Sequence, residues 1–224
     1  MDRRRFLLGA APVGLATLVT AGCARGPGVQ GHSYAPSYFR PSEWEFVQAA
    51  VGRLIPGDGP GPGGIEAGVP EFIDRQMELP YGHGSYFYMK GPFHPDSPAT
   101  LGYQLRFTPR EIYRQGIEEA NAAARASHGI DFARLEAARQ DEFLESMEKG
   151  LLAFATVPAP ALFDQLLENT REGYFCDPIH GGNRDMVAWR WIGFPGARAD
   201  FTDWIDQAGV KYPYGPVSIG GAHT

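Results

Sequence analysis

The sequence predicts a mainly α-helical single domain with long irregular segments rich in glycine, proline and aromatic residues, preceded by a signal peptide. Three observations support this fold class. Apolar residues recur at helical spacing in several stretches that begin at recognisable helix starts. No stretch of any length alternates apolar and polar residues, as a half-buried strand would. Removing the signal leaves about 200 residues, enough to bury one hydrophobic core.

Residues 1–24 have the layout of an export signal, which is a basic tip followed by an apolar run. The paired Arg3 and Arg4, with Phe6 and Leu7 behind them, resemble the twin-arginine motif, which is read by machinery that exports folded proteins. We therefore expect a periplasmic protein. The alternative is a retained membrane anchor, because the uncharged stretch approaches the ~20 residues that span a bilayer.

Cys23 lies at the end of this signal, behind small residues that resemble a lipobox, in which the thiol is acylated and becomes the new N-terminus. Ordinary cleavage near Gly22 or Ala24 is the alternative, so lipidation stays open. The other cysteine, Cys176, is expected to be a small buried hydrophobe rather than a reactive thiol. With Cys23 at the edge of the signal, no internal disulfide is expected.

We expect a tether over residues 25–40 and a helical domain over residues 41–224. Ser42 is the expected N-cap of the first helix, with Glu45 three places on as its capping-box partner. Apolar residues then recur at helical spacing as far as Ile55, and Pro56-Gly57 ends the helix.

Two irregular segments flank the second expected helix. The Gly- and Pro-rich stretch 57–64 cannot form a helix or strand, and it is interpreted either as a spacer or as a close backbone approach to a ligand or partner. A helix is expected from Pro70, at the first helical position, to Leu79. Residues 80–107 are rich in aromatics, glycine and proline, and we interpret them as an irregular packed excursion and a candidate contact surface.

Three further helices are expected along the chain. Thr108 and Glu111 form a capping box around Pro109, and this helix should run to about Ser127 and stop at Gly129 in a left-handed conformation. The next helix is expected over 132–149. The last is expected to open at Pro160 and close at Gly173.

Charge excludes one class of partner. The formal net charge is −6, and it becomes more negative when the arginine-rich signal is removed. No basic patch remains to neutralise phosphates, so we expect no nucleic-acid binding.

The densest motif is the stretch 173–196, which we call the 173–196 block. Its glycines permit positive φ and close backbone approach, Asn183 can bridge backbone groups in a turn, and Arg184 offers a planar fork to a carboxylate such as Asp177 or Asp185. One interpretation is a buried turn that organises Trp189 and Trp191 against the helices. The other is docking to a partner. The candidate residues of this motif are Asp177, His180, Gly181, Gly182, Asn183, Arg184, Asp185 and Trp189.

The chain resembles the family of gluconate 2-dehydrogenase subunit 3, the small subunit of sugar and polyol dehydrogenase complexes. Three stretches carry the resemblance: the twin-arginine start, the segment from Leu54 to Asp74, and the 173–196 block. The resemblance implies a complex of three parts. A large flavoprotein binds FAD and oxidises the sugar, a multihaem cytochrome c passes electrons to the quinone pool, and the small subunit accompanies the flavoprotein. The twin-arginine signal of the small subunit would then export both, and the 173–196 block would dock to the flavoprotein near its substrate entrance.

The residues agree with a chain that holds no cofactor of its own. The sequence has no Gly-x-Gly-x-x-Gly motif for a dinucleotide, no Cys-x-x-Cys-His motif for covalent haem, and too few cysteines for an iron–sulfur cluster. The first hypothesis is thus a non-catalytic, membrane-associated subunit. The second is a free-standing periplasmic lipoprotein that binds a small ligand. The third is an enzyme that uses His180, for which no ligand spacing or nucleophile motif is present.

Overall fold

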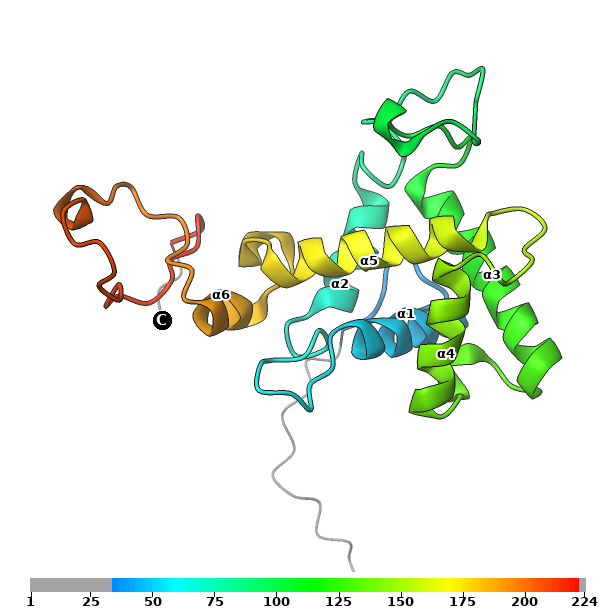
Figure 1. Cartoon of the computed structure of the whole chain (residues 1–224), viewed down its shortest axis with the longest axis horizontal. Helices are drawn as coiled ribbons and strands as arrows, with labels where there is room; N and C mark the ends of the chain where they lie inside the picture. Colours follow the sequence, from blue (N-terminus) through cyan, green and yellow to red (C-terminus); the bar gives the residue numbers. More distant parts are fainter. Residues whose placement is uncertain (1–33, 222–224) are drawn as a thin grey trace, which may run out of the picture. The chain divides into compact units, whose positions relative to one another are not determined.

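The computed structural model of the 224-residue chain describes residues 34–221. Over this range the chain forms six α-helices and no β-strand, which confirms the mainly α-helical prediction. The expected signal over residues 1–24, including Arg3, Arg4, Phe6, Leu7 and Cys23, lies outside the described residues. The helices, shown in Figure 1, are α1 (Pro41–Leu54), α2 (Val69–Glu78), α3 (Pro109–His128), α4 (Ala137–Glu148), α5 (Ala159–Phe175) and α6 (Val187–Ile192).

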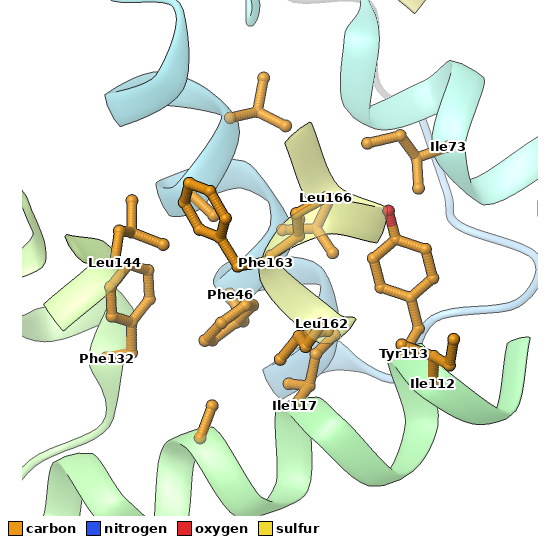
Figure 2. Close-up of a cluster of buried hydrophobic side chains, with 14 of the residues drawn as sticks. Phe46, Ile73, Ile112, Tyr113, Ile117, Phe132, Leu144, Leu162, Phe163 and Leu166 are labelled. Atoms are coloured by element: carbon orange, nitrogen blue, oxygen red, sulfur yellow. The ribbon is translucent and has the colours of Figure 1, made fainter. Parts of the chain in front are cut away.

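Helix α5 is the centre of the hydrophobic core and contacts α1, α2, α3, α4 and α6. Its apolar residues Leu162, Phe163 and Leu166 are buried among side chains from the surrounding helices. Figure 2 shows these three residues together with Phe46 of α1, Ile73 of α2, Tyr113 of α3 and Leu144 of α4. The buried face of α5 is broad, and the neighbouring helices cover it, so burial of this face is what stabilises the helix.

The start of α1 differs from the prediction. The helix begins at Pro41, so Ser42 lies exposed in the first turn and Arg40 occupies the N-cap position. Glu43, rather than Glu45, accepts a hydrogen bond from the Arg40 backbone N–H at 2.8 Å. Glu43 also pairs with Arg114 of α3. A tertiary ion pair thus fixes the acidic partner of this turn, which sequence spacing alone did not reveal.

Helix α3 starts and stops as predicted. The Thr108 backbone N–H donates to the Glu111 carboxylate at 2.8 Å, and Pro109 occupies the first helical position. At the other end Gly129 adopts φ 78°, a left-handed conformation that glycine enters without steric cost. The capping box and the terminal glycine both lie within the helix segment itself, so the sequence alone was enough to predict the two ends of α3.

The expected continuous helix over 132–149 is wrong at its start. Residues Phe132–Arg134 form a separate 3₁₀ turn, and α4 begins only at Ala137. The Phe132 backbone N–H donates to Asn121 Oδ1 at 3.2 Å, and Gln140 Nε2 donates to the Phe132 carbonyl at 3.2 Å. Gln140 of α4 therefore satisfies a carbonyl that a continuous helix would have paired internally, while Asn121 of α3 satisfies an N–H that has no intrahelical partner at a helix start.

The predicted end of α5 at Gly173 is also wrong, because the helix continues to Phe175. Gly173 is buried inside the helix against α2. A Cβ atom there would lie 2.7 Å from the Phe72 ring, so this glycine permits close packing of α5 on α2 instead of ending the helix.

The described part of the expected tether, residues 34–40, packs against α2. The carboxylate of Asp74, fully buried in α2, accepts hydrogen bonds from the backbone N–H groups of Ser37, Tyr38 and Phe39 at 2.7–3.0 Å, and from the hydroxyls of Tyr34 and Ser37. Tyr38 and Phe39 are consequently part of the core.

The C-terminal segment 197–221 contains one short 3₁₀ turn, Thr202–Trp204, and it contributes no residue to the hydrophobic core. It returns to the body through a parallel bridge between Gly196 and Val217. In the described part of the chain, no helix has both the length and the apolar character to cross a membrane.

Candidate functional site

The 173–196 block forms a short series of turns between α5 and α6. Asp177 caps the 3₁₀ turn Pro178–His180 by accepting a hydrogen bond from the Ile179 backbone N–H at 3.1 Å. Pro178 occupies the first position of this turn and Gly181, with φ 96°, ends it. A second 3₁₀ turn, Arg184–Met186, leads directly into α6.

The same Asp177 carboxylate also holds the C-terminal segment. It accepts hydrogen bonds from the Ser218 hydroxyl at 2.6 Å and from the Ile219 backbone N–H at 2.8 Å, across more than forty residues of chain. Desolvation disfavours the charged form of this buried group, but the hydrogen bonds from Ser218, Ile219 and Ile179 outweigh it and hold the pKa of Asp177 below its usual value. Asp177 is therefore ionised, and its hydrogen bonds hold the C-terminal segment against the 173–196 block. We call these bonds to Ser218 and Ile219 the Asp177 clasp.

Each glycine of the central pair is required by its surroundings. A Cβ atom on Gly182 would collide with the carbonyl oxygen of Gly173, near the C-terminal end of α5. A Cβ atom on Gly181 would crowd the flexible guanidinium of Arg75 in α2, and the φ of 96° disfavours any residue other than glycine there. The two glycines let the backbone lie directly on α5 and α2.

Asn183 bridges backbone groups on both sides of this contact. The side chain is fully buried; Nδ2 donates to the Cys176 carbonyl and Oδ1 accepts from the Ala188 N–H, both at 3.0 Å. The Asn183 N–H donates to the Gly173 carbonyl at 2.9 Å. Asn183, Asp185 and Met186 all have positive φ, between 42° and 55°. Such strained backbone persists only where surrounding contacts fix it, and the buried Asn183 supplies those contacts.

Arg184 does not pair with Asp177 or Asp185 as predicted. It pairs with Glu71 of α2 at 2.8 Å, and its backbone N–H donates to the Ala67 carbonyl at 2.9 Å. Asp177 is occupied by the C-terminal segment, while Asp185 is exposed and belongs to the strained turn. Two of the three sequence stretches that carry the resemblance, the segment from Leu54 to Asp74 and the 173–196 block, thus meet in space.

The two tryptophans have different environments. Trp189 is 6% exposed, donates from Nε1 to the Phe175 carbonyl at 2.8 Å, and meets Phe194 edge-to-face. Trp191 is 52% exposed, and its indole lies over the Gly-rich loop, about 3.0 Å from where a Cβ atom on Gly61 would be. The 57–64 loop was interpreted either as a spacer or as a close backbone approach to a ligand or partner, and in the structure it approaches this chain's own Trp191.

The titratable groups of the block show no catalytic arrangement. His180 is exposed at the end of its turn, and Cys176 is half-buried. Desolvation raises the pKa of the Cys176 thiol to about 11, which keeps it protonated and unreactive near neutral pH. Across residues 34–221, no group of three or more histidine, cysteine, aspartate or glutamate side chains is placed to hold a metal ion.

Sequence reasoning missed the roles of Asp74 and Glu71. The available signal was the position of Asp74 within the buried face of α2, four residues after Pro70 and three before Met77, where an apolar residue would be expected. A buried acid needs donors, and the neighbouring 34–40 segment provides them. No comparable signal identified Ser218, because its partner Asp177 is distant in the sequence.

One comparison with known proteins gives a match. The model of a protein family described as gluconate 2-dehydrogenase subunit 3 matches residues 41–196, which covers α1 to α6 and the whole 173–196 block. The searches of curated proteins and of solved structures found no match.

Proposed function

Because the chain belongs to the gluconate 2-dehydrogenase subunit 3 family, we propose that it is the non-catalytic small subunit of a periplasmic, membrane-associated dehydrogenase that oxidises a sugar or polyol. Its role is to bind the folded FAD-containing large subunit, stabilise it, and bring it through the twin-arginine export machinery. A multihaem cytochrome c subunit passes the electrons on. Association with the membrane occurs through these partners or through a lipid on Cys23.

The observation that supports docking is a set of exposed apolar side chains on the 173–196 block, which we call the apolar rim: Phe175, Ile179, Trp191, Ile192 and Phe194. Each is 45–55% exposed. Soluble proteins expose single apolar residues routinely, whereas exposed apolar residues that gather on one surface mark interaction sites. Aromatic residues are also enriched at the centre of protein interfaces.

The backbone below the apolar rim is held in one conformation before any partner binds. The buried Asn183 and the hydrogen bond from Trp189 fix the turns from which the rim projects. A preformed surface loses little conformational entropy on binding, so more of the apolar burial contributes to affinity. Binding the folded flavoprotein but not its unfolded chain stabilises the flavoprotein by mass action.

Export and stabilisation are separated by a pair of expression experiments. Without this chain, the flavoprotein should give little dehydrogenase activity in the periplasm. With a variant carrying Arg3→Lys and Arg4→Lys, the complex should still form but remain in the cytoplasm, because the signal and the docking surface are separate parts of the chain. Full periplasmic activity of the flavoprotein expressed alone would contradict the proposal.

Docking through the apolar rim is tested with matched variants. Trp191→Ala combined with Ile192→Ser should reduce co-purification of the flavoprotein by about tenfold or more, since both residues belong to the rim. Leu151→Ala combined with Ile130→Ser changes two apolar residues that are exposed elsewhere, and binding should be unaffected. A wild-type chain that purifies as a monomer and never with a flavoprotein would instead favour a free-standing lipoprotein.

A further inference from the structure

A second feature suited to a partner lies away from the 173–196 block. A cavity of about 220 Å³ opens between the 80–107 excursion and helices α3 and α5. Its walls include Tyr81, Phe87, Tyr103 and Ile112, and two carboxylates, Asp164 and Glu168, belong to its lining. We call it the aromatic–acidic pocket. Its volume is below the 300–1,000 Å³ of most sites for small molecules and suits a single side chain.

The aromatic walls are fixed by contacts with each other and with α5. The ring centroid of Phe87 lies 4.8 Å from that of Tyr103 and 6.0 Å from that of Tyr81. The Tyr81 hydroxyl accepts hydrogen bonds from Gln165 and from Asn169, at 2.5 and 2.9 Å. The pocket is therefore formed in advance, and an occupant does not have to order it.

The charge of the pocket is negative and unbalanced. Asp164, Glu168 and Glu172 follow one another at four-residue spacing, so they share one face of α5. No basic residue lines the pocket, and none of these three carboxylates takes part in an ion pair within residues 34–221. Like charges at this spacing repel each other and destabilise a helix. No ion pair in the described chain offsets this repulsion, although Glu172 accepts a hydrogen bond from Asn169.

The titration behaviour of the stripe agrees with an uncompensated negative field. Desolvation and the neighbouring Glu148 raise the pKa of Asp164 above its usual value. Desolvation and Glu168 raise the pKa of Glu172, although a hydrogen bond from Asn169 opposes them. No cation contributes to either shift.

We propose that the aromatic–acidic pocket receives an arginine side chain from the flavoprotein subunit. A guanidinium is planar, stacks on aromatic rings, and forms paired hydrogen bonds with a carboxylate, so it matches both the walls and the charge of this pocket. Arginine is also enriched at interface cores, where lysine is depleted. The inference rests on the proposed function, because it requires a partner subunit, but the pocket is separate from the apolar rim.

The test measures binding of the purified flavoprotein by wild-type chain and by a variant carrying Asp164→Asn and Glu168→Gln. The variant should raise the dissociation constant at least about tenfold at low salt, as loss of an anchoring pair does. Wild-type binding should weaken between 50 and 300 mM NaCl, and the variant should lose most of that salt dependence. The matched control, Glu45→Gln with Asp206→Asn, removes two exposed charges elsewhere and should bind like the wild type.

Two outcomes separate this inference from the proposed function. If wild type and variant bind the flavoprotein with equal affinity and equal salt dependence, the inference is wrong while the proposed function stands. If the wild-type chain binds no flavoprotein, the proposed function fails. Binding of an arginine side chain by the pocket is then tested on the isolated chain. N-acetyl-arginine amide should then shift the ring proton resonances of Tyr81, Phe87 and Tyr103 in the wild type only. Equal or absent shifts in wild type and variant would overturn the inference.

Discussion

Asp74 shows how one residue can join two parts of this chain. Its fully buried carboxylate accepts five hydrogen bonds from Tyr34, Ser37, Tyr38 and Phe39, three of them from backbone N–H groups. Desolvation opposes ionisation of Asp74, but the hydrogen bonds from Phe39, Ser37 and Tyr34 outweigh it, so the pKa lies below its usual value. The residue is a buried anion stabilised by donors instead of by a cation.

Replacing Asp74 with Asn should lower the free energy of unfolding by about 3 kcal/mol at pH 7. The amide offers one acceptor oxygen, and its NH₂ group meets backbone donors that it cannot pair with, which leaves buried groups unsatisfied. Urea unfolding of the purified chain measures the change. Glu45→Gln, on the exposed side of α1, serves as the control and should stay within about 0.5 kcal/mol of wild type.

The pH dependence of this effect has a definite sign. The folded-state pKa of Asp74 is lower than the unfolded value of about 3.9. Its ionisation therefore contributes stability that is present above the unfolded pKa and is lost as the pH falls through the folded pKa. The difference between wild type and Asp74→Asn should be largest at pH 5–7 and shrink below pH 4. A difference that grew with acidification would contradict this account.

For the 173–196 block, the sequence predicted the kind of interaction that a residue makes better than it predicted the residue's partner. Two adjacent glycines followed by an asparagine predicted a tight turn with a bridging amide, and Asn183 makes those bridges. Arg184 was expected to pair within the block, yet it pairs with Glu71, more than a hundred residues earlier. Side-chain chemistry restricts what a residue can bind, whereas the identity of its partner depends on how α2 and α5 pack.

At the scale of elements, the N-termini of α1 and α3 form a natural comparison. Both segments contain a hydroxyl residue followed by a glutamate three places on. Thr108 is the true N-cap of α3, with its N–H bound to Glu111, whereas Ser42 lies inside the first turn of α1. Thr108→Ala should therefore lower the free energy of unfolding by about 1 kcal/mol, and Ser42→Ala should change it by less than 0.5 kcal/mol.

Thermal or urea unfolding of the two alanine variants measures this difference directly. Equal losses in both would show that Ser42 caps α1 after all. A loss confined to Thr108→Ala would agree with the start of α1 being fixed by Pro41 and by the tertiary contact between Glu43 and Arg114.

The accuracy of the element predictions follows from where their signals lie. The caps of α3 are local, and the sequence located both ends of that helix. Gly173 resembles a helix stop, but it is used for close contact with Phe72, and this requirement exists only once α5 lies on α2. Likewise, the break after Arg134 depends on Asn121 and Gln140 reaching the backbone of Phe132. The existence of α1 to α5 was thus predictable, whereas α6 was not predicted, and the start of α4 and the end of α5 were set by tertiary contacts.

At the scale of the whole molecule, the C-terminal segment 197–221 contributes little to the packing of the hydrophobic core. The buried cluster extends from Tyr38 to Ala188 and includes no residue of 197–221. The segment is attached by the Asp177 clasp to Ser218 and Ile219 and by the bridge between Gly196 and Val217. The family match also ends at residue 196. Packing therefore indicates that the helical body does not need the segment in order to fold.

A chain that ends at Gly196 should accordingly keep its helical content and unfold cooperatively. Losing the clasp costs about 1–2 kcal/mol, because Asp177 exchanges its protein donors for water, and this lowers Tm by about 2–8 °C in a domain of this size. Circular dichroism measures the helical content, and calorimetry measures Tm and the cooperativity of unfolding. As a control, a chain that ends at Met186 also loses buried Ala188 and Trp189 and should unfold far more easily. If the chain ending at Gly196 lost cooperative unfolding as well, residues 197–221 would belong to the folding unit, and the hydrophobic cluster would not be the source of the stability of the body.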